Sequence, residues 1–108
     1  MAGKSPTQRS LEELRKLGYP LIQVVERWNS WARIRQDLFG FIDILAIDDN
    51  GTVLAVQATS RDNVAARVAK IAESESVIWV RKAGWRIEVH GWGKMASGRW
   101  ELRRVDVS

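Results

Sequence analysis

The stretch from Asp37 to Ser60, DLFGFIDILAIDDNGTVLAVQATS, constrains the fold of this chain more than any other. Valine, isoleucine, leucine and phenylalanine fill both of its halves, and residues of these types favour strands. The turn sequence DDNGT separates the halves, so we expect a hairpin of two long strands. Asp43 falls inside the first apolar strand, where an unpaired carboxylate is costly. It is therefore the residue whose presence most needs a functional explanation.

The turn sequence is compatible with two hairpin loops, and they place Asp43 differently. A two-residue Asn-Gly loop would pair Ile44 with Gln57 and put Asp43 on the opposite face. A three-residue Asp-Asn-Gly loop, a type I turn followed by a left-handed glycine, would pair Asp43 with Gln57. The order of the three residues favours the longer loop. Thr59 would then share the face of Gln57, because strand side chains alternate.

Composition indicates one domain over residues 1–108 and limits its partners. A chain of 108 residues can bury enough surface to fold alone. The formal net charge of +4 and the pI of about 10.0 favour an anionic partner such as nucleic acid. The absence of cysteine excludes disulfides and thiolate metal sites, and it is typical of a reducing cytoplasm. No apolar run is long enough to span a membrane, so we expect no membrane partner.

Tryptophan is frequent, with six residues at positions 28, 31, 79, 85, 92 and 100. Large aromatic side chains most often pack in the core or along its edges. They also stack on unpaired bases or anchor subunit interfaces. Both interpretations stay open from the sequence alone.

Hydrophobic periodicity divides the rest of the chain into short elements. The expected order is a helix over 7–17, a strand over 19–28, a polar loop over 29–36, the hairpin of 37–60, a helix over 62–73, a short helix over 77–83, and strands over 85–92 and 99–107. Gly18 is typical of the end of the first helix, and the segment 77–83 could also form a strand. The order α-β-β-β-α-short α-β-β predicts an α/β fold, a mixed central sheet flanked by helices.

The pattern of motifs resembles the PD-(D/E)XK nuclease superfamily. The likeness rests on DLFGFIDILAI, on LAVQATS after the hairpin and on NVAARVAKI in the next helix, and it covers most of residues 7–74. The chain is most similar to small archaeal-type Holliday junction resolvases and their phage or bacterial relatives. The resemblance implies a restriction-endonuclease-like three-layer core and a homodimer. It also implies a cytoplasmic endonuclease that depends on Mg²⁺, with Mn²⁺ as a substitute, and cleaves duplex or branched DNA.

The resemblance also assigns roles to particular residues of the hairpin. Asp43 matches the strand aspartate that binds the metal, and Gln57 stands where a second acid is expected. The carbonyl of Ala58 matches a backbone metal ligand, and Thr59 stands at the position of a catalytic lysine. An amide oxygen can ligate a hard cation but brings no charge. Gln57 and Thr59 are therefore the departures from the usual pattern.

Further acids and cations would have to complete the site. Glu13 matches the helix acid of the family, with Glu12 as its alternative, and Glu26 on the first strand is another candidate. Lys70 or Arg67 on the second helix could supply the missing cation. The arginines expected to bind DNA are Arg33, Arg35, Arg61 and Arg67.

Simpler interpretations stand beside these. Asp43 could pair with a buried arginine, and Asp37 is interpreted as a carboxylate at the start of a strand or in a loop rather than a ligand. His90, the single histidine, is expected to be structural, since one histidine cannot build a histidine-rich metal site. The chain could also be a catalytically decayed nuclease fold that binds DNA, or an assembly protein that uses its tryptophans as contacts.

Overall fold

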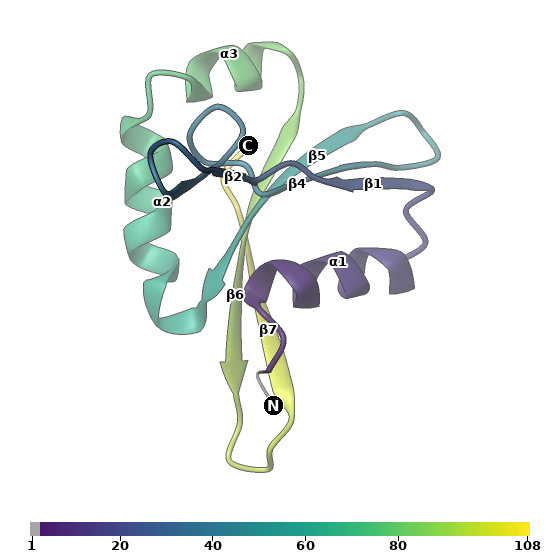
Figure 1. The fold of residues 1–108 in the computed structure, drawn as a ribbon. Coiled ribbons are helices and arrows are strands. Elements are labelled where there is room, and N and C mark those ends of the chain that lie inside the picture. Colours follow the sequence, from purple (N-terminus) through teal and green to yellow (C-terminus); the bar gives the residue numbers. More distant parts are fainter. Residues whose placement is uncertain (1–2) are drawn as a thin grey trace.

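The structure is a computed structural model that describes residues 3–108. Within that range the chain forms a five-stranded sheet of order β1-β4-β5-β6-β7 and a separate two-stranded hairpin, β2–β3 (Figure 1). The elements are α1 (Pro6–Lys16), β1 (Leu21–Val24), β2 (Arg27–Asn29), β3 (Ile34–Gln36), β4 (Ile44–Ile47), β5 (Val53–Ser60), a 3-10 turn (Arg61–Asn63), α2 (Val64–Glu73), α3 (Val77–Lys82), β6 (Arg86–Lys94) and β7 (Trp100–Asp106). The predicted α/β fold with a mixed, helix-flanked sheet is confirmed.

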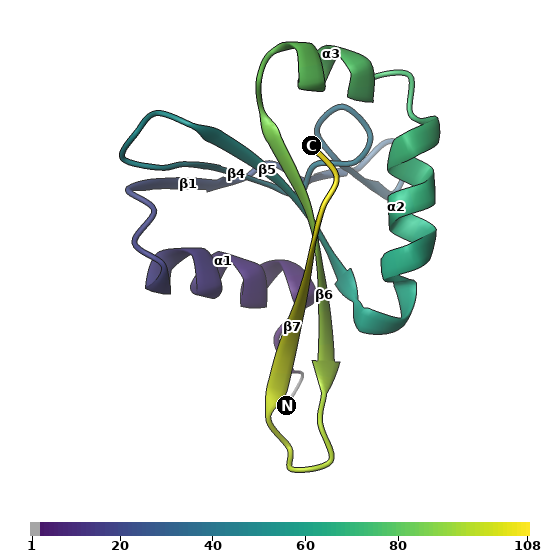
Figure 2. The same ribbon diagram turned by 180° about the vertical axis from the view of Figure 1, so that it is seen from behind.

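Helices cover both faces of the sheet, because the buried strands are apolar on both sides. Leu14 of α1 packs on one face, in a cluster that includes Val56 of β5. Ile71 of α2 and Val80 of α3 pack on the other face, in a cluster that includes the neighbouring Ala55. Beyond these layers β6 and β7 continue as a long hairpin, which extends past α1 (Figure 2).

The β4–β5 turn has the predicted three-residue loop. Ile47 pairs with Val53, and the amide of Asp48 donates to the carbonyl of Thr52 at 3.1 Å. Gly51 closes the loop with φ of +80°, a conformation that glycine adopts without strain. This register brings Asp43 and Gln57 to the same side of the sheet.

The first arm of the hairpin is shorter than the sequence predicts. The sequence predicts a strand from Asp37 onward, but residues 38–42 form a tight loop closed by an isolated bridge between Leu38 and Ile42. Phe39 and Gly40 take φ angles of +55° and +85°, which no strand can accommodate. Asp43 therefore lies at the start of β4 and not within a strand.

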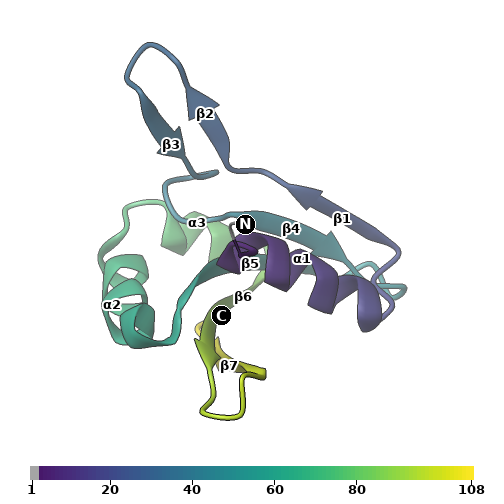
Figure 3. The same cartoon turned by 60° about the horizontal axis from the view of Figure 1, so that its bottom comes forward.

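The strand expected over 19–28 is also divided. The chain leaves the main sheet after Val24, where the amides of Val25 and Glu26 donate to the carbonyl of Asp43 at 2.8 and 3.3 Å. It then forms β2, and the predicted polar loop 29–36 returns as β3 (Figure 3). The prediction missed this hairpin because its strands are short and carry an Arg-Trp-Asn and an Ile-Arg-Gln sequence rather than an apolar pattern.

The helices agree closely with the sequence. Ser5 caps α1 by accepting from the amide of Gln8 at 3.1 Å, and Gly18 follows the helix with φ of +86°. The segment 77–83 is helical over Val77–Lys82, which decides between the two predicted alternatives. Among the helices of residues 3–108, none combines the length and the apolar character that crossing a membrane requires.

Candidate metal site

Three carboxylates converge where the chain leaves and re-enters the main sheet. Glu26 follows β1, Asp37 follows β3, and Asp43 precedes β4. Each offers a carboxylate oxygen, and these oxygens all lie within 4.8 Å of one another. The β2–β3 hairpin begins directly after the first of these acids and ends directly before the second. We call Glu26, Asp37 and Asp43 the acidic cluster.

Asp43 is the buried member of the acidic cluster, with only 4% of its surface exposed. Its Oδ2 accepts a hydrogen bond from the amide of Ala58 at 2.8 Å, which holds the carboxylate against β5. Burial above all, and then the neighbouring Asp37 and Glu26, raise the pKa of Asp43 to about 8 against the opposing effect of the Ala58 amide. The site therefore disfavours a third negative charge unless a cation compensates it.

Gln57 faces the same cavity from β5. It is 2% exposed, and within residues 3–108 no hydrogen-bond partner reaches its Oε1. Buried polar oxygens are nearly always paired, since an unpaired one loses its hydration without compensation. An oxygen-seeking group in the cavity would supply the missing partner.

The cavity beside the acidic cluster has a volume of about 300 Å³. Its lining consists of Glu26, Arg35, Asp37, Asp43, Gln57, Ala58, Arg67 and Lys70. Three carboxylates and an amide oxygen form an all-oxygen donor set, which is the kind that Mg²⁺ and Ca²⁺ prefer. The residues present therefore fit a hard divalent cation.

Cationic side chains surround these oxygens. The Nη1 of Arg35 contacts the Oε1 of Glu26 at 3.2 Å, and α2 brings Arg67 and Lys70 to the cavity wall. An adjoining cavity of about 430 Å³ is lined by Arg35, Gln36, Asp37, Gly40 and Lys70. Positive charge thus borders the acidic cluster on the side of α2 and of the β2–β3 hairpin, where an anionic ligand would be attracted.

Most of the residues implied by the resemblance meet in this cavity, but Glu13 does not. Glu13 lies on α1, which packs on the opposite face of the sheet, and its charge acts on Arg104 of β7. Glu26, the alternative acid, takes part in the acidic cluster instead. Asp37 also joins it, although the sequence favoured a strand-start or loop carboxylate over a ligand at this position. Gly40 is the sequence feature that could have predicted this position of Asp37, because glycine readily adopts the left-handed conformation that turns the chain back toward Asp43.

Other predicted residues lie outside the cavity. Thr59 is buried in β5 beside Gly91 of β6 and does not line the cavity. Arg61 contacts Glu101 of β7 at 3.2 Å, and Arg33 belongs to the turn of the β2–β3 hairpin. Thr59, the residue at which the resemblance implies a catalytic lysine, therefore contributes no group to this cavity.

The alternative of a buried arginine partner for Asp43 is not what the structure shows. Within residues 3–108 no arginine or lysine lies within 4.0 Å of the Asp43 carboxylate oxygens, and the nearby Arg35 pairs with Glu26. The local cations therefore leave the Asp43 carboxyl group without an ionic partner.

His90 belongs to a separate polar network under α1. The indole N–H of Trp92 donates to Ser10 Oγ at 2.9 Å, so the hydroxyl of Ser10 donates in turn to His90 Nδ1 at 2.9 Å. His90 Nε2 then donates to Glu88 at 3.0 Å, and Arg104 also contacts Glu88. Every buried polar group in this chain of bonds has a partner, so the network needs no ligand to complete it.

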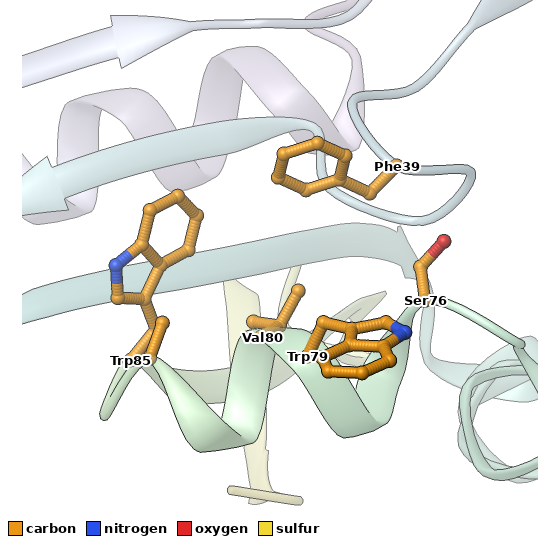
Figure 4. A pocket seen from close by; sticks show the side chains of 6 residues that line it. Phe39, Ser76, Trp79, Val80 and Trp85 are labelled. Carbon is orange, nitrogen blue, oxygen red and sulfur yellow. The ribbon is translucent and has the colours of Figure 1, made fainter.

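An apolar cavity of about 310 Å³ lies between the loop 38–42 and α3 (Figure 4). Phe39, Ser76, Trp79, Val80, Ala83 and Trp85 line it, and the rings of Phe39 and Trp85 lie 6.3 Å apart. This cavity contains no carboxylate, histidine or other titratable group. The ionisable side chains that could bind a cation are gathered instead at the acidic cluster.

Comparisons with protein families, with curated proteins and with solved structures found no match to this chain.

Proposed function

We propose that this protein is a divalent-cation-dependent DNA endonuclease whose reaction takes place at the acidic cluster. The proposal depends on one observation above all. Three carboxylates and the side chain of Gln57 line one cavity, and within residues 3–108 the buried Oε1 of Gln57 has no hydrogen-bond partner. A resolvase-like substrate, branched or duplex DNA, fits the net positive charge of the chain.

Asp43, Asp37 and Glu26 would hold a Mg²⁺ or Mn²⁺ ion together with Gln57 Oε1. A bound ion of this kind supplies an activated water and neutralises phosphate charge. Asp43 would act as the rigid anchor, because the Ala58 amide and its burial fix its position. The carbonyl of Ala58 remains a proposed further ligand.

The cations of the cavity would bind the DNA. Lys70 and Arg67 extend from α2 and would stabilise charge that develops on the scissile phosphate. Lys70 would thus replace the strand lysine for which Thr59 stands. Arg35 would orient Glu26 and meet the phosphate backbone from the other side of the cavity.

Glu26 and Asp37 offset the acid missing at Gln57. With Asp43 they give the site three carboxylates, whereas the position of Gln57 contributes only a dipole. The charge that the cation needs is therefore present, although it comes from different parts of the chain than the resemblance implies. We propose that the nuclease works as a homodimer, a prediction that analytical ultracentrifugation checks by the mass in solution.

The test is cleavage of labelled branched, duplex and single-stranded DNA with Mg²⁺, with Mn²⁺ and with chelator. We expect metal-dependent cuts by the native chain and a loss of at least about 100-fold in Asp43→Asn, since the anchor of the cation is removed. Asp49→Asn, in the exposed turn between β4 and β5, is the matched control and should cleave normally.

A catalytically decayed DNA-binding module is the second candidate. Gln57 and Thr59, in place of the usual acid and lysine, favour it. DNA binding that persists in chelator, without cuts in either metal, would replace the nuclease by this module. An absence of both DNA binding and DNA cleavage would contradict both the nuclease and the DNA-binding module.

A further inference from the structure

The β2–β3 hairpin stands apart from both hydrophobic clusters. Its strands form a sheet of their own, and Figure 3 shows them projecting from the rest of the fold. A two-stranded hairpin of this size gains little stability from its own pairing. The side chains of the hairpin are therefore not required for the hydrophobic core and are available to bind a partner.

The side chains of the hairpin combine bare aromatic surface with net positive charge. Residues 27–36, RWNSWARIRQ, contain three arginines and no acidic residue. Trp31 in the turn is 97% exposed, and Trp28 and Ile34 are exposed as well. Arginine beside exposed aromatic rings is the combination by which proteins bind unpaired nucleic acid, because bases stack on the rings and phosphates meet the cations.

The turn holds its tryptophan in a defined place. The Oδ1 of Asn29 accepts from the amides of Trp31 and Ala32 at 3.0 and 3.1 Å. Arg33 takes φ of +53°, an unfavourable conformation for a residue that is not glycine. A conformation of this kind persists only where the surrounding structure fixes it. Arg33 and Trp31 lie in the same turn, so the backbone that carries Trp31 is held in one conformation.

Both ends of the hairpin start from the acidic cluster. β2 follows Glu26, β3 precedes Asp37, and Arg35 of β3 contacts Glu26 at 3.2 Å. Trp31 therefore lies close along the chain to the proposed metal site. It is five residue steps from Glu26, so the Cα atoms of the two residues are at most about 17 Å apart at 3.3–3.4 Å per step. The same length corresponds to about five base steps of duplex DNA.

We propose that this hairpin is a nucleic-acid arm whose Trp31 stacks on unpaired bases at a boundary between single-stranded and duplex DNA. Arg27 and Arg33 hold the adjoining phosphates. The inference rests on the proposed nuclease for its substrate and narrows that substrate to DNA with an unpaired strand near the cut. A fully paired four-way junction offers Trp31 no unpaired base, so the arm does not favour it over plain duplex.

The experiment measures binding in chelator, so that it does not depend on cleavage. The probes are a fluorescent forked duplex with single-stranded arms, a fully paired duplex of equal length and a fully paired four-way junction. The variants are Trp31→Ala, Trp31→Phe and, as the matched control, Trp79→Ala on α3, whose side chain is 66% exposed. Because the side chain of Trp31 is 97% exposed, Trp31→Ala should leave the fold intact, and circular dichroism checks this.

We expect Trp31→Ala to weaken fork binding by roughly 5- to 150-fold, the range for one stacked base. Binding to the paired duplex and junction should change less than about twofold, since stacking on an unpaired base is absent there. Trp31→Phe should retain most of the fork binding, and Trp79→Ala should change nothing. With Mg²⁺ added, the native chain should cut within about five nucleotides of the boundary.

Three results would overturn the inference. The first is an equal loss on fork and duplex, and the second is an equal effect of Trp79→Ala. The third is a change in the mass of the particle in Trp31→Ala with fork binding intact, which would assign the hairpin to contacts between copies of this chain. Fork-selective binding without any cleavage would support the nucleic-acid arm and contradict the nuclease. The experiment therefore distinguishes a failure of the arm from a failure of the proposed nuclease.

Discussion

Asp43 and Gln57 are both buried polar residues, but their local environments differ. The carboxylate of Asp43 has the Ala58 amide as a partner, whereas the Oε1 of Gln57 has none within the described chain. An unsatisfied buried acceptor costs about 1–3 kcal/mol of folding free energy. Such a cost is expected where a ligand, absent from the isolated chain, completes the site.

The substitution Gln57→Met tests this interpretation at the level of one residue. Methionine keeps the length of the side chain and removes the oxygen, so the metal-free protein should gain about 1 kcal/mol of stability. The same change should reduce the rise in Tm that Mg²⁺ produces. Thermal unfolding with Mg²⁺ and with chelator measures both effects. An unchanged Mg²⁺ response would show that Gln57 is not a ligand.

The same position also allows the opposite change. Gln57→Glu restores the acid that the resemblance leads one to expect, and the added charge should increase the Mg²⁺-dependent rise in Tm. It should also destabilise the metal-free protein, since a fourth carboxylate joins the acidic cluster. The two variants thus shift the metal response in opposite directions.

At the level of elements, the contact between β6 and the start of α2 positions the cationic wall of the cavity. α2 supplies Arg67 and Lys70, and its first residue, Val64, lies directly against Gly91 of β6. A Cβ on Gly91 would overlap the side chain of Val64 and approach the Cα of Arg61 to 3.1 Å. Glycine is therefore required there for the close approach of helix and strand.

The substitution Gly91→Ala should accordingly destabilise the protein by about 1–3 kcal/mol, because backbone and core must shift to admit the methyl group. Gly93→Ala is the matched control in the same strand. A Cβ there would meet only the mobile end of the Arg61 side chain, which can move aside. Chemical denaturation gives both free energies, and equal losses would contradict the packing argument.

At the scale of the whole molecule, buried carboxyl groups on the two faces of the sheet have pKa values shifted in opposite directions. Under α1 the carboxylate of Glu88 is buried, which would raise its pKa, but hydrogen bonds from His90 and Arg104 hold the pKa below its usual value. On the side of α2 burial raises the pKa of Asp43 instead, to about 8. The charge of Glu88 is thus compensated by His90 and Arg104, whereas Asp43 requires a proton or a cation.

These opposite shifts predict how stability depends on pH in the metal-free protein. The contribution of Glu88 is present above its ordinary pKa of 4.5 and is lost in more acidic solution. The contribution of protonated Asp43 is full below pH 3.8 and is lost as the pH rises toward about 8. Stability in chelator should therefore be greatest at mildly acidic pH and fall toward pH 8.

Thermal melts over pH 4–9 would measure this dependence. Asp43→Asn should remove the decline toward pH 8 and keep the loss at acidic pH, and Mg²⁺ should stabilise the native chain most at high pH. A native chain that gains stability from pH 5 to 8 in chelator would show that Asp43 is not held neutral by its surroundings.

The local features of this fold were predictable from the sequence. The Asp-Asn-Gly loop determined the register of β4 and β5, and Ser5 and Gly18 marked the ends of α1. These features depend on a few consecutive residues, whose turn and cap geometries are the same in any protein. For that reason the turn residues alone were enough to predict that Asp43 and Gln57 share one face.

The acidic cluster itself was decided by the tertiary structure. Asp37 and Glu26 are eleven residues apart and come together only because the intervening hairpin leaves the main sheet and returns to the same point. Glu13 was excluded because α1 packs on the other face of the sheet. The sequence by itself determined the helices and the face that each residue of the β4–β5 hairpin takes, since those choices follow from neighbouring residues. Only long-range packing could determine which carboxylates share the cavity.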